Sequence, residues 1–193
     1  MESRDATYSS NFTVNGTLTN TGSFEVNNGS GGTRTFGGSI VNQGTLTLSG
    51  GPTLTMTNAT LQNAAGGTLR GVGTLSLTNT PLTNGGTIAP GVNSAATLTT
   101  SNFTQSAAGA ASIDVDSAAV DRVAVSGAAV LDGTLNLSRL NGFIPPIGAA
   151  FDILTFTSRT GTFSAVNGAS IGNGTKFQVN YSTTKVTLTV VPE

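Results

Sequence analysis

An eleven-residue phrase recurs three times in this chain, and this recurrence restricts the fold more than any other feature of the sequence. The copies read GTLTNTGSFEV, GSIVNQGTLTL and GTLRGVGTLSL, and they begin at Gly16, Gly38 and Gly67. Their third, ninth and eleventh positions are apolar or aromatic. The ninth and eleventh share one face of a strand because strand side chains alternate between two faces. Each copy therefore predicts a short strand, a corner and a longer strand.

Glycine begins each half of each copy, where it permits the backbone geometry of a sharp corner. The predicted turn glycines are Gly16, Gly22, Gly38, Gly44, Gly67 and Gly73. One such unit cannot bury its apolar side alone, but stacked copies can. The first two copies begin 22 residues apart and the next two 29 residues apart, a spacing typical of solenoids. We interpret the longer interval as holding an added alternating run, PTLTMTNATLQ, and GTIAPG at Gly86 as a weaker fourth copy.

The apolar pattern predicts an all-β chain, since no stretch has the i, i+3, i+4, i+7 spacing of an amphipathic helix. The period favours a parallel β-solenoid. An antiparallel β-sandwich is the alternative, because hairpins also produce turn signals at regular intervals.

The chain changes character at the stretch SAAGAAS, from Ser106 to Ser112. Carboxylates are absent between Val26 and Ile113 and become frequent afterwards. We therefore divide the chain into solenoid repeats at 1–108 and a C-terminal β region at 109–193 that continues or caps the solenoid. The alternating runs KFQVNY and KVTLTV near the C-terminus predict a hairpin, and the Pro-Pro pair in NGFIPPIG predicts a loop.

Composition excludes several classes of function. Charged residues make up 9% of the chain, against the roughly 25% usual for soluble domains. Cysteine and histidine are absent, and the net charge of −1 provides no basic surface for nucleic acid. No apolar run reaches the length of a membrane span. The start, MESRDATYSS, lacks the pattern of a signal peptide, so we expect none in the numbered chain.

Candidate catalytic and metal-binding residues are confined to the C-terminal half. Asp114 and Asp116 share one face of an expected strand and lie about 7 Å apart, a separation that suits a carboxylate pair. Together with Asp121 they offer hard oxygens for calcium. Their order does not match a calcium loop. General acid–base chemistry needs paired titratable groups, and the repeat region has no carboxylate between Val26 and Ile113 and no histidine. We therefore expect no enzyme, no cofactor and no metal site, with these three aspartates as weak calcium candidates.

Several stretches resemble the passenger-domain repeats of bacterial autotransporters and of related repeat-rich exported proteins, including those of the PEP-CTERM type. They are GTIAPG, FTQSAAGAASIDV, DRVAVSGAAVLDGTLNLSRLNGF and GTFSAV, and the terminal VTLTVVPE is similar to the start of a PEP-CTERM sorting signal. The resemblance implies a right-handed parallel β-helix, export, and a role at the cell surface or in an extracellular matrix. It implies no catalytic residue.

These features predict an extracellular structural or adhesive protein. Open solenoid ends can pair with other chains, so we expect self-association, with filaments as one form and with Phe12 and Val14 as assembly candidates. The first alternative is a carbohydrate-binding adhesin module that binds surface glycans, for which Phe143 is the best aromatic candidate. The second is a polysaccharide-cleaving β-helix enzyme that uses Asp114 or Asp116.

Overall fold

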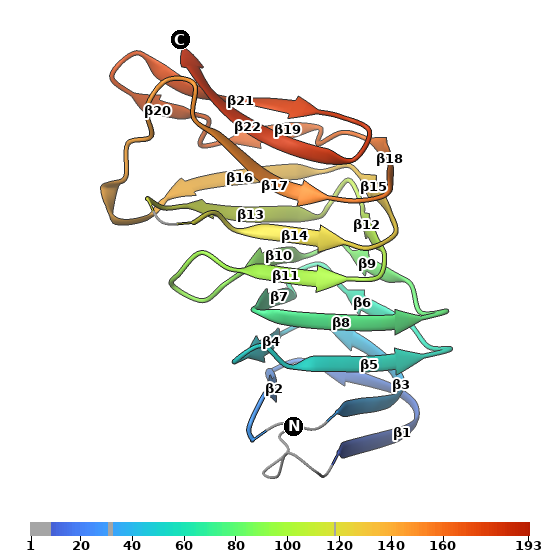
Figure 1. Cartoon of the computed structure of the whole chain (residues 1–193). Coiled ribbons are helices and arrows are strands. Elements are labelled where there is room, and N and C mark those ends of the chain that lie inside the picture. The colour runs from blue at the N-terminus through green and yellow to red at the C-terminus, as the bar shows by residue number, and fades with distance from the viewer. Residues whose placement is uncertain (1–8, 31–32, 118) are drawn as a thin grey trace.

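The computed structural model describes residues 9–30, 33–117 and 119–193, and it consists of stacked β coils with a β-hairpin at one end (Figure 1). Two strands make each of the first two coils, and three strands make every later coil. The strands of the coils are β1 (Ser10–Asn20), β2 (Ser23–Asn27), β3 (Arg34–Asn42), β4 (Thr45–Ser49), β5 (Thr53–Thr57), β6 (Leu61–Asn63), β7 (Thr68–Gly71), β8 (Gly73–Thr78), β9 (Leu82–Asn84), β10 (Thr87–Pro90), β11 (Thr97–Thr100), β12 (Phe103–Gln105), β13 (Ala110–Val115), β14 (Arg122–Val125), β15 (Ala128–Leu131), β16 (Thr134–Arg139), β17 (Ala150–Thr155), β18 (Ser158–Gly161) and β19 (Ala165–Asn167). The last coil is followed by β20 (Ser170–Gly172), β21 (Thr175–Tyr181) and β22 (Lys185–Pro192).

Equivalent strands of successive coils pair in parallel and form two sheets. Sheet A is the seven-stranded sheet β2-β4-β7-β10-β13-β16-β19, and sheet B is the fifteen-stranded sheet that holds the other strands. Sheet B forms two walls, because β3 pairs with β5 through its first residues and with β6 through its last. The predicted parallel β-solenoid is therefore confirmed, and the antiparallel sandwich is wrong.

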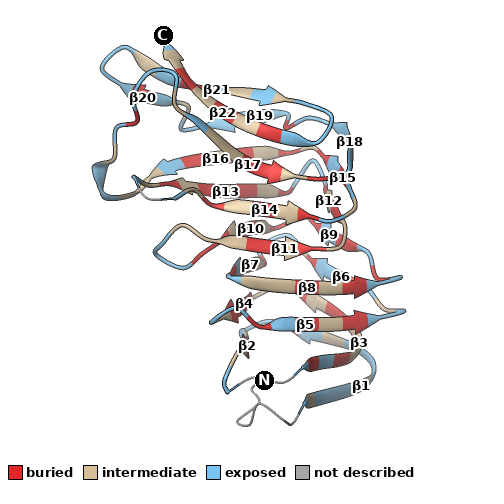
Figure 2. Cartoon of the chain, in the orientation of Figure 1, coloured by how far each residue is buried: buried red, intermediate tan, exposed pale blue. Residues whose placement is uncertain are grey.

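The core is a set of inward-facing columns that run from coil to coil. In sheet A, Leu46, Leu69 and Ile88 occupy equivalent positions on neighbouring strands, and the column continues through Ala111 and Leu135. All five side chains are buried. Figure 2 shows the same alternation of buried and accessible positions along most strands of the coils. The period-two apolar pattern of the sequence thus arises because alternate side chains of each strand point into the core.

The third copy of the phrase was aligned one face out of register. Leu69 pairs with Leu46 and not with Ile40, while Leu75 pairs with Leu54. Gly67 is therefore equivalent to Gly44. The run PTLTMTNATLQ at 52–62, which the sequence pattern marks as an addition, supplies β5 and most of β6, which are regular strands of their coil. The alignment of the third copy was wrong because strands on all three faces of the coil have similar sequences rich in Gly, Thr and Leu. A strand from one face can therefore be aligned with a strand from another.

A ladder of buried amides lies at the corner that precedes sheet A. The side-chain Nδ2 of Asn20 donates to Oδ1 of Asn42 at 2.7 Å, and the same bond joins Asn42 to Asn63 and Asn63 to Asn84 at 2.7 Å each. Nδ2 of Asn84 then donates to Oε1 of Gln105 at 3.2 Å. Each step spans one coil, so the ladder fixes the register of five successive corners.

The turn glycines fall into two groups with different physical reasons. Gly16, Gly38 and Gly73 have φ angles of 128°, 117° and 154°, which side-chain-bearing residues rarely adopt. Gly44 and Gly67 face the coil below, where a Cβ would collide with the carbonyl oxygens of Gly22 and Asn42 respectively.

Gly22 itself, in the first coil, has no atom within 4 Å of the position of a Cβ among the described residues. The second group of glycines therefore permits close stacking of the coils, and Gly22 occupies the same column without that contact.

The composition change at Ser106–Ser112 is not a structural break, because β10 and β13 pair across it and so do β12 and β15. The coils continue to β19. The predicted hairpin is confirmed as β21 and β22, and β22 pairs antiparallel with β17. The Pro-Pro segment is a loop that follows a short 3-10 turn at Leu140–Gly142. The cap therefore begins well after residue 109.

Candidate functional site

The three aspartates considered for calcium lie at one corner but do not converge on a common point. No group of three or more metal-ligating acidic side chains forms among the described residues. Asp121 is 1% exposed, and its carboxylate accepts the backbone N–H of Ala96 at 2.8 Å and of Asp114 at 3.0 Å. Asp121 thus ties the connection before β11 to the end of β13, which is a structural task.

Burial raises the pKa of Asp121 to about 7, against an ordinary value of 3.8. The two backbone N–H groups oppose this rise because they stabilise the ionised form, and the negative charge of Asp114 adds to it. The carboxyl of Asp121 therefore titrates near neutral pH in the folded protein.

Asp114 and Asp116 face outward and take part in local hydrogen bonds. Asp114 accepts the hydroxyl of Ser138 on the next coil, and Asp116 accepts the amide Nδ2 of Asn141 at 3.2 Å. Asp116 also accepts the backbone N–H of Ser117 at 2.6 Å. These contacts connect neighbouring coils, and the expected carboxylate pair stays a prediction.

The two ends of the solenoid are built differently. At the N-terminal end, β1 pairs only with β3 and β2 only with β4, so each leaves one edge without a strand partner among the described residues. Phe12 is 47% exposed and its ring lies 5.6 Å from that of Phe36, while Val14 is partly buried against the core. Of the two assembly candidates, Phe12 is therefore the accessible one.

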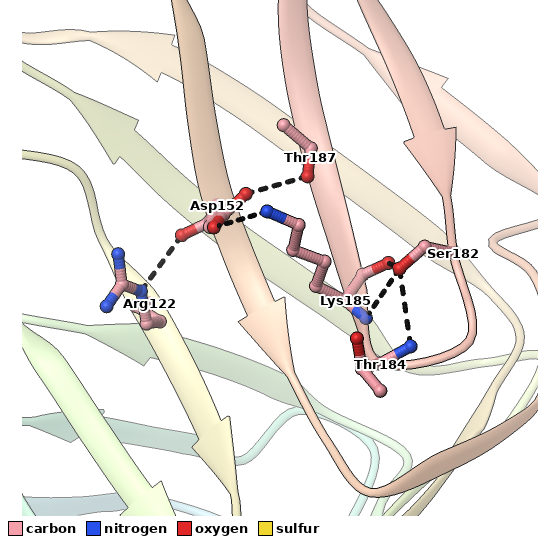
Figure 3. Close-up of polar contacts among 6 residues, drawn as sticks. All are labelled: Arg122, Asp152, Ser182, Thr184, Lys185 and Thr187. Carbon is pink, nitrogen blue, oxygen red and sulfur yellow. Dashed lines mark hydrogen bonds and ion pairs between the residues drawn. The ribbon is translucent and has the colours of Figure 1, made fainter.

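At the C-terminal end a polar cluster fastens the hairpin to the last coil (Figure 3). The carboxylate of Asp152 on β17 accepts Nζ of Lys185 at 3.0 Å and Oγ1 of Thr187 at 2.7 Å, both from β22. Arg122 on β14 donates Nε to the backbone carbonyl of Asp152 at 3.0 Å. Burial opposes ionisation of Asp152, but the bonds from Thr187 and Lys185 outweigh it and lower its pKa.

The outer face of sheet A carries a groove with a cavity volume of about 360 Å³. Its floor includes Glu25, Thr47 and Arg70, which occupy equivalent outward positions on β2, β4 and β7. Nε of Arg70 donates to Oγ1 of Thr47 at 3.3 Å. One wall comes from the connection at 91–96, which projects from the coils ahead of β11 in Figure 1.

Sequence reasoning missed this groove, although the sequence contains a signal for it. Between residues 6 and 113 the chain has only three charged side chains, Glu25, Arg34 and Arg70. Arg34 is buried and donates Nε to the carbonyl oxygen of Asn27 at 3.0 Å. The other two are exposed, and both line the groove. Assigning each strand to its correct face of the coil would have placed Glu25 and Arg70 two strands apart on the same face.

Phe143, the aromatic residue considered for glycan contact, is half-buried and packs against the core. Its backbone carbonyl accepts Nη1 of Arg139 at 3.0 Å. Its neighbours Ile144 and Ile147 are 53% and 63% exposed. The loop therefore presents aliphatic side chains rather than an aromatic ring.

Comparison with known proteins adds no family to this description. No protein-family model matches the chain, and a search of curated proteins finds no significant relative. Across the described ranges, no helix combines the length and the hydrophobicity needed to cross a membrane.

Proposed function

We propose that this protein is an extracellular structural or adhesive unit that associates with a second copy through its N-terminal end. The difference between the two ends carries this proposal. Sheet edges that lack a partner can pair with another chain, and such edges are usually protected in natural proteins. At the C-terminal end a hairpin pairs with β17 and leaves only the outer edges of β18 and β19 without a strand, whereas at the N-terminal end neither β1 nor β2 has an outer strand partner among the described residues, and the ring of Phe12 is exposed.

Such an arrangement favours pairs over the filaments considered from the sequence. A molecule with one open end can meet a second molecule at the same end, and the resulting two-fold interface closes on itself. Continued growth needs a second end on which a complete coil can stack, and β22 blocks this at the C-terminal end because it occupies the outer edge of β17.

The surface composition fits an extracellular role. Among the side chains of 9–113 that face outward, hydroxyl and amide groups predominate, and only Glu25 and Arg70 are both charged and exposed. Such a surface changes its charge little with pH, and its interactions are only weakly screened by salt. The resemblance to autotransporter passenger and PEP-CTERM repeats supports the same location at or beyond the cell surface.

Sedimentation velocity over a range of protein concentrations tests the association. We expect wild-type protein to approach a dimer as concentration rises, and Phe12→Asp to stay monomeric because a charge would be buried at the interface. Val130→Asp is the matched control, since Val130 is 42% exposed on β15, a strand of the side wall. A wild-type protein that is monomeric throughout, or a Phe12→Asp variant that still pairs, would refute the proposal.

A second candidate function, recognition of surface glycans, is favoured by the groove on sheet A. Hydroxyl, carboxylate and guanidinium groups converge there beside aliphatic side chains, a mixture typical of sites for small polar ligands.

A further inference from the structure

We propose that the groove on sheet A binds a uronic acid residue of an acidic polysaccharide, with the sugar carboxylate on Arg70 and ring hydroxyls on Glu25. This inference names the ligand class for the glycan-binding candidate and rests on it. It does not require the association of two molecules.

The position of the two charged side chains is the first argument. Among the described residues from 9 to 113, Glu25 and Arg70 are the only exposed charged ones, and both line one groove. They flank Thr47 on β4, so their backbones are two strand spacings apart, about 10 Å. This distance leaves room for a sugar ring between a guanidinium and a carboxylate.

The state of Arg70 is the second argument. Its Nε is engaged by Thr47, which orients the guanidinium along the sheet. Among the described residues, no hydrogen bond is formed by its two terminal nitrogens. An arginine held in this way presents a planar pair of donors, and the geometry of that pair matches a carboxylate.

The groove wall is the third argument. The connection from β10 to β11 has six residues, whereas the connection from β7 to β8 has only Val72. Val92 of the longer connection and Val72 both line the groove, and they are 44% and 39% exposed. Aliphatic groups of this kind can contact the C–H face of a sugar. The connection ends at Ala96, whose N–H is held by Asp121 at 2.8 Å.

These features favour an acidic sugar over other ligands. A neutral glycan would leave the guanidinium without a counter-charge in a partly desolvated site. A phosphate group carries a larger negative charge than a carboxylate, so Glu25 would repel it more strongly. A sulfate ester spreads its single charge over three oxygens, so each oxygen accepts a weaker hydrogen bond from Arg70 than a carboxylate oxygen does. The cavity of about 360 Å³ lies near the lower end of the roughly 300–1,000 Å³ of ligand pockets, which suits one or two sugar rings. Sheet A is fully paired at β4 and β7, so a peptide cannot add there as a strand.

Isothermal titration with a galacturonic acid trisaccharide tests the proposal, with a neutral galactose trisaccharide and a sulfated oligosaccharide as comparisons. We expect the wild-type protein to prefer the uronic acid ligand. Arg70→Gln should weaken that binding about tenfold or more, the effect of losing a hydrogen bond to a charged group. Lys176→Gln is the control, because it makes the same change in net charge at an exposed position of β21.

Glu25→Gln provides a second measurement that a merely structural role would not change. It should weaken the uronic acid complex and strengthen binding of the sulfated ligand. The proposal is overturned if the neutral or sulfated ligand binds as well as the uronic acid, if no ligand binds, or if Arg70→Gln and Lys176→Gln have equal effects. Repeating the titration on Phe12→Asp separates this result from that of the association test.

Discussion

Individual polar residues in this protein are buried where they bridge neighbouring coils. Asn63 is 1% exposed, accepts from Asn42 and donates to Asn84, and its Nδ2 also reaches the carbonyl oxygen of Thr87 at 2.9 Å. An amide suits this position because it carries both donors and acceptors, so identical residues can pair in a column. Serine is too short to span the gap, and a carboxylate would bring charges of the same sign together.

Asp121 gives the molecule a pH dependence at the scale of one residue. Its folded-state pKa of about 7 lies above the ordinary 3.8, so the folded chain holds a proton that the unfolded chain has lost. The stabilisation is therefore complete below about pH 4 and is lost as pH rises through 7. The pKa values of Asp132 and Asp152 are lowered, so these two groups change the stability only below the pH range in which Asp121 acts.

We expect the urea midpoint of the wild-type protein to fall between pH 4.5 and pH 8, and Asp121→Asn to remove most of that slope. The asparagine variant should also be less stable overall, because its NH2 group meets a backbone N–H where the carboxylate accepted one. Asp116→Asn is the control and should keep the wild-type slope. An unchanged slope in Asp121→Asn would show that another group is responsible.

At the scale of the element, the coil repeat depends on glycines that touch the coil below. A Cβ on Gly86 would collide with the carbonyl oxygens of Gly67 and Ala64. Gly22 lies in the same column of the first coil, where no atom among the described residues is within 4 Å. Neither residue has the positive φ that would penalise alanine independently of space.

We therefore expect Gly86→Ala to destabilise the protein by about 3 kcal/mol or more, since backbone must shift to relieve the contact. Gly22→Ala should change the free energy of unfolding by less than about 0.5 kcal/mol. Urea unfolding of the two variants measures the difference. Equal effects would mean that the glycines act through backbone entropy and not through coil contact.

The strands could be predicted from the sequence because the alternation of apolar residues is a local pattern. Their phase, meaning which face of the coil each strand occupies, could not be predicted. Leu46, Leu54 and Leu61 lie on three different faces, yet each directly follows a threonine. Their local sequences therefore do not distinguish the faces. The asparagine ladder would have set the phase, since Asn20 and Asn42 recur one coil apart. Asparagine is common in this chain, so the ladder members could not be recognised without the coil length.

The groove was missed for the same reason. Glu25 and Arg70 are 45 residues apart in the chain, and only the correct phase places them on equivalent positions. The residues singled out instead, Asp114 and Asp116, are close in sequence, and proximity of this kind is visible without knowledge of the fold.

On the scale of the whole molecule, the two ends set how many copies can join. The hairpin covers the outer edge of β17 at the C-terminal end and contributes buried apolar residues, among them Phe177, Val186 and Leu188. Its ring contact between Phe151 and Phe177, at 6.3 Å, joins the last coil to the cap. Without the hairpin, β17 would lose the strand that pairs with its outer edge.

A chain that ends at Gly168, and so lacks the hairpin, should therefore change from limited pairs to open-ended polymers. Exposed parallel strands at both ends allow each molecule to pair twice. Negative-stain electron microscopy should show rods of uniform width that lengthen with concentration. The same truncation combined with Phe12→Asp should stop the growth, which distinguishes ordered assembly from the general stickiness of an exposed core. The cap does not limit assembly if the truncated chain stays monomeric, or if it forms amorphous aggregates to the same extent with and without Phe12→Asp.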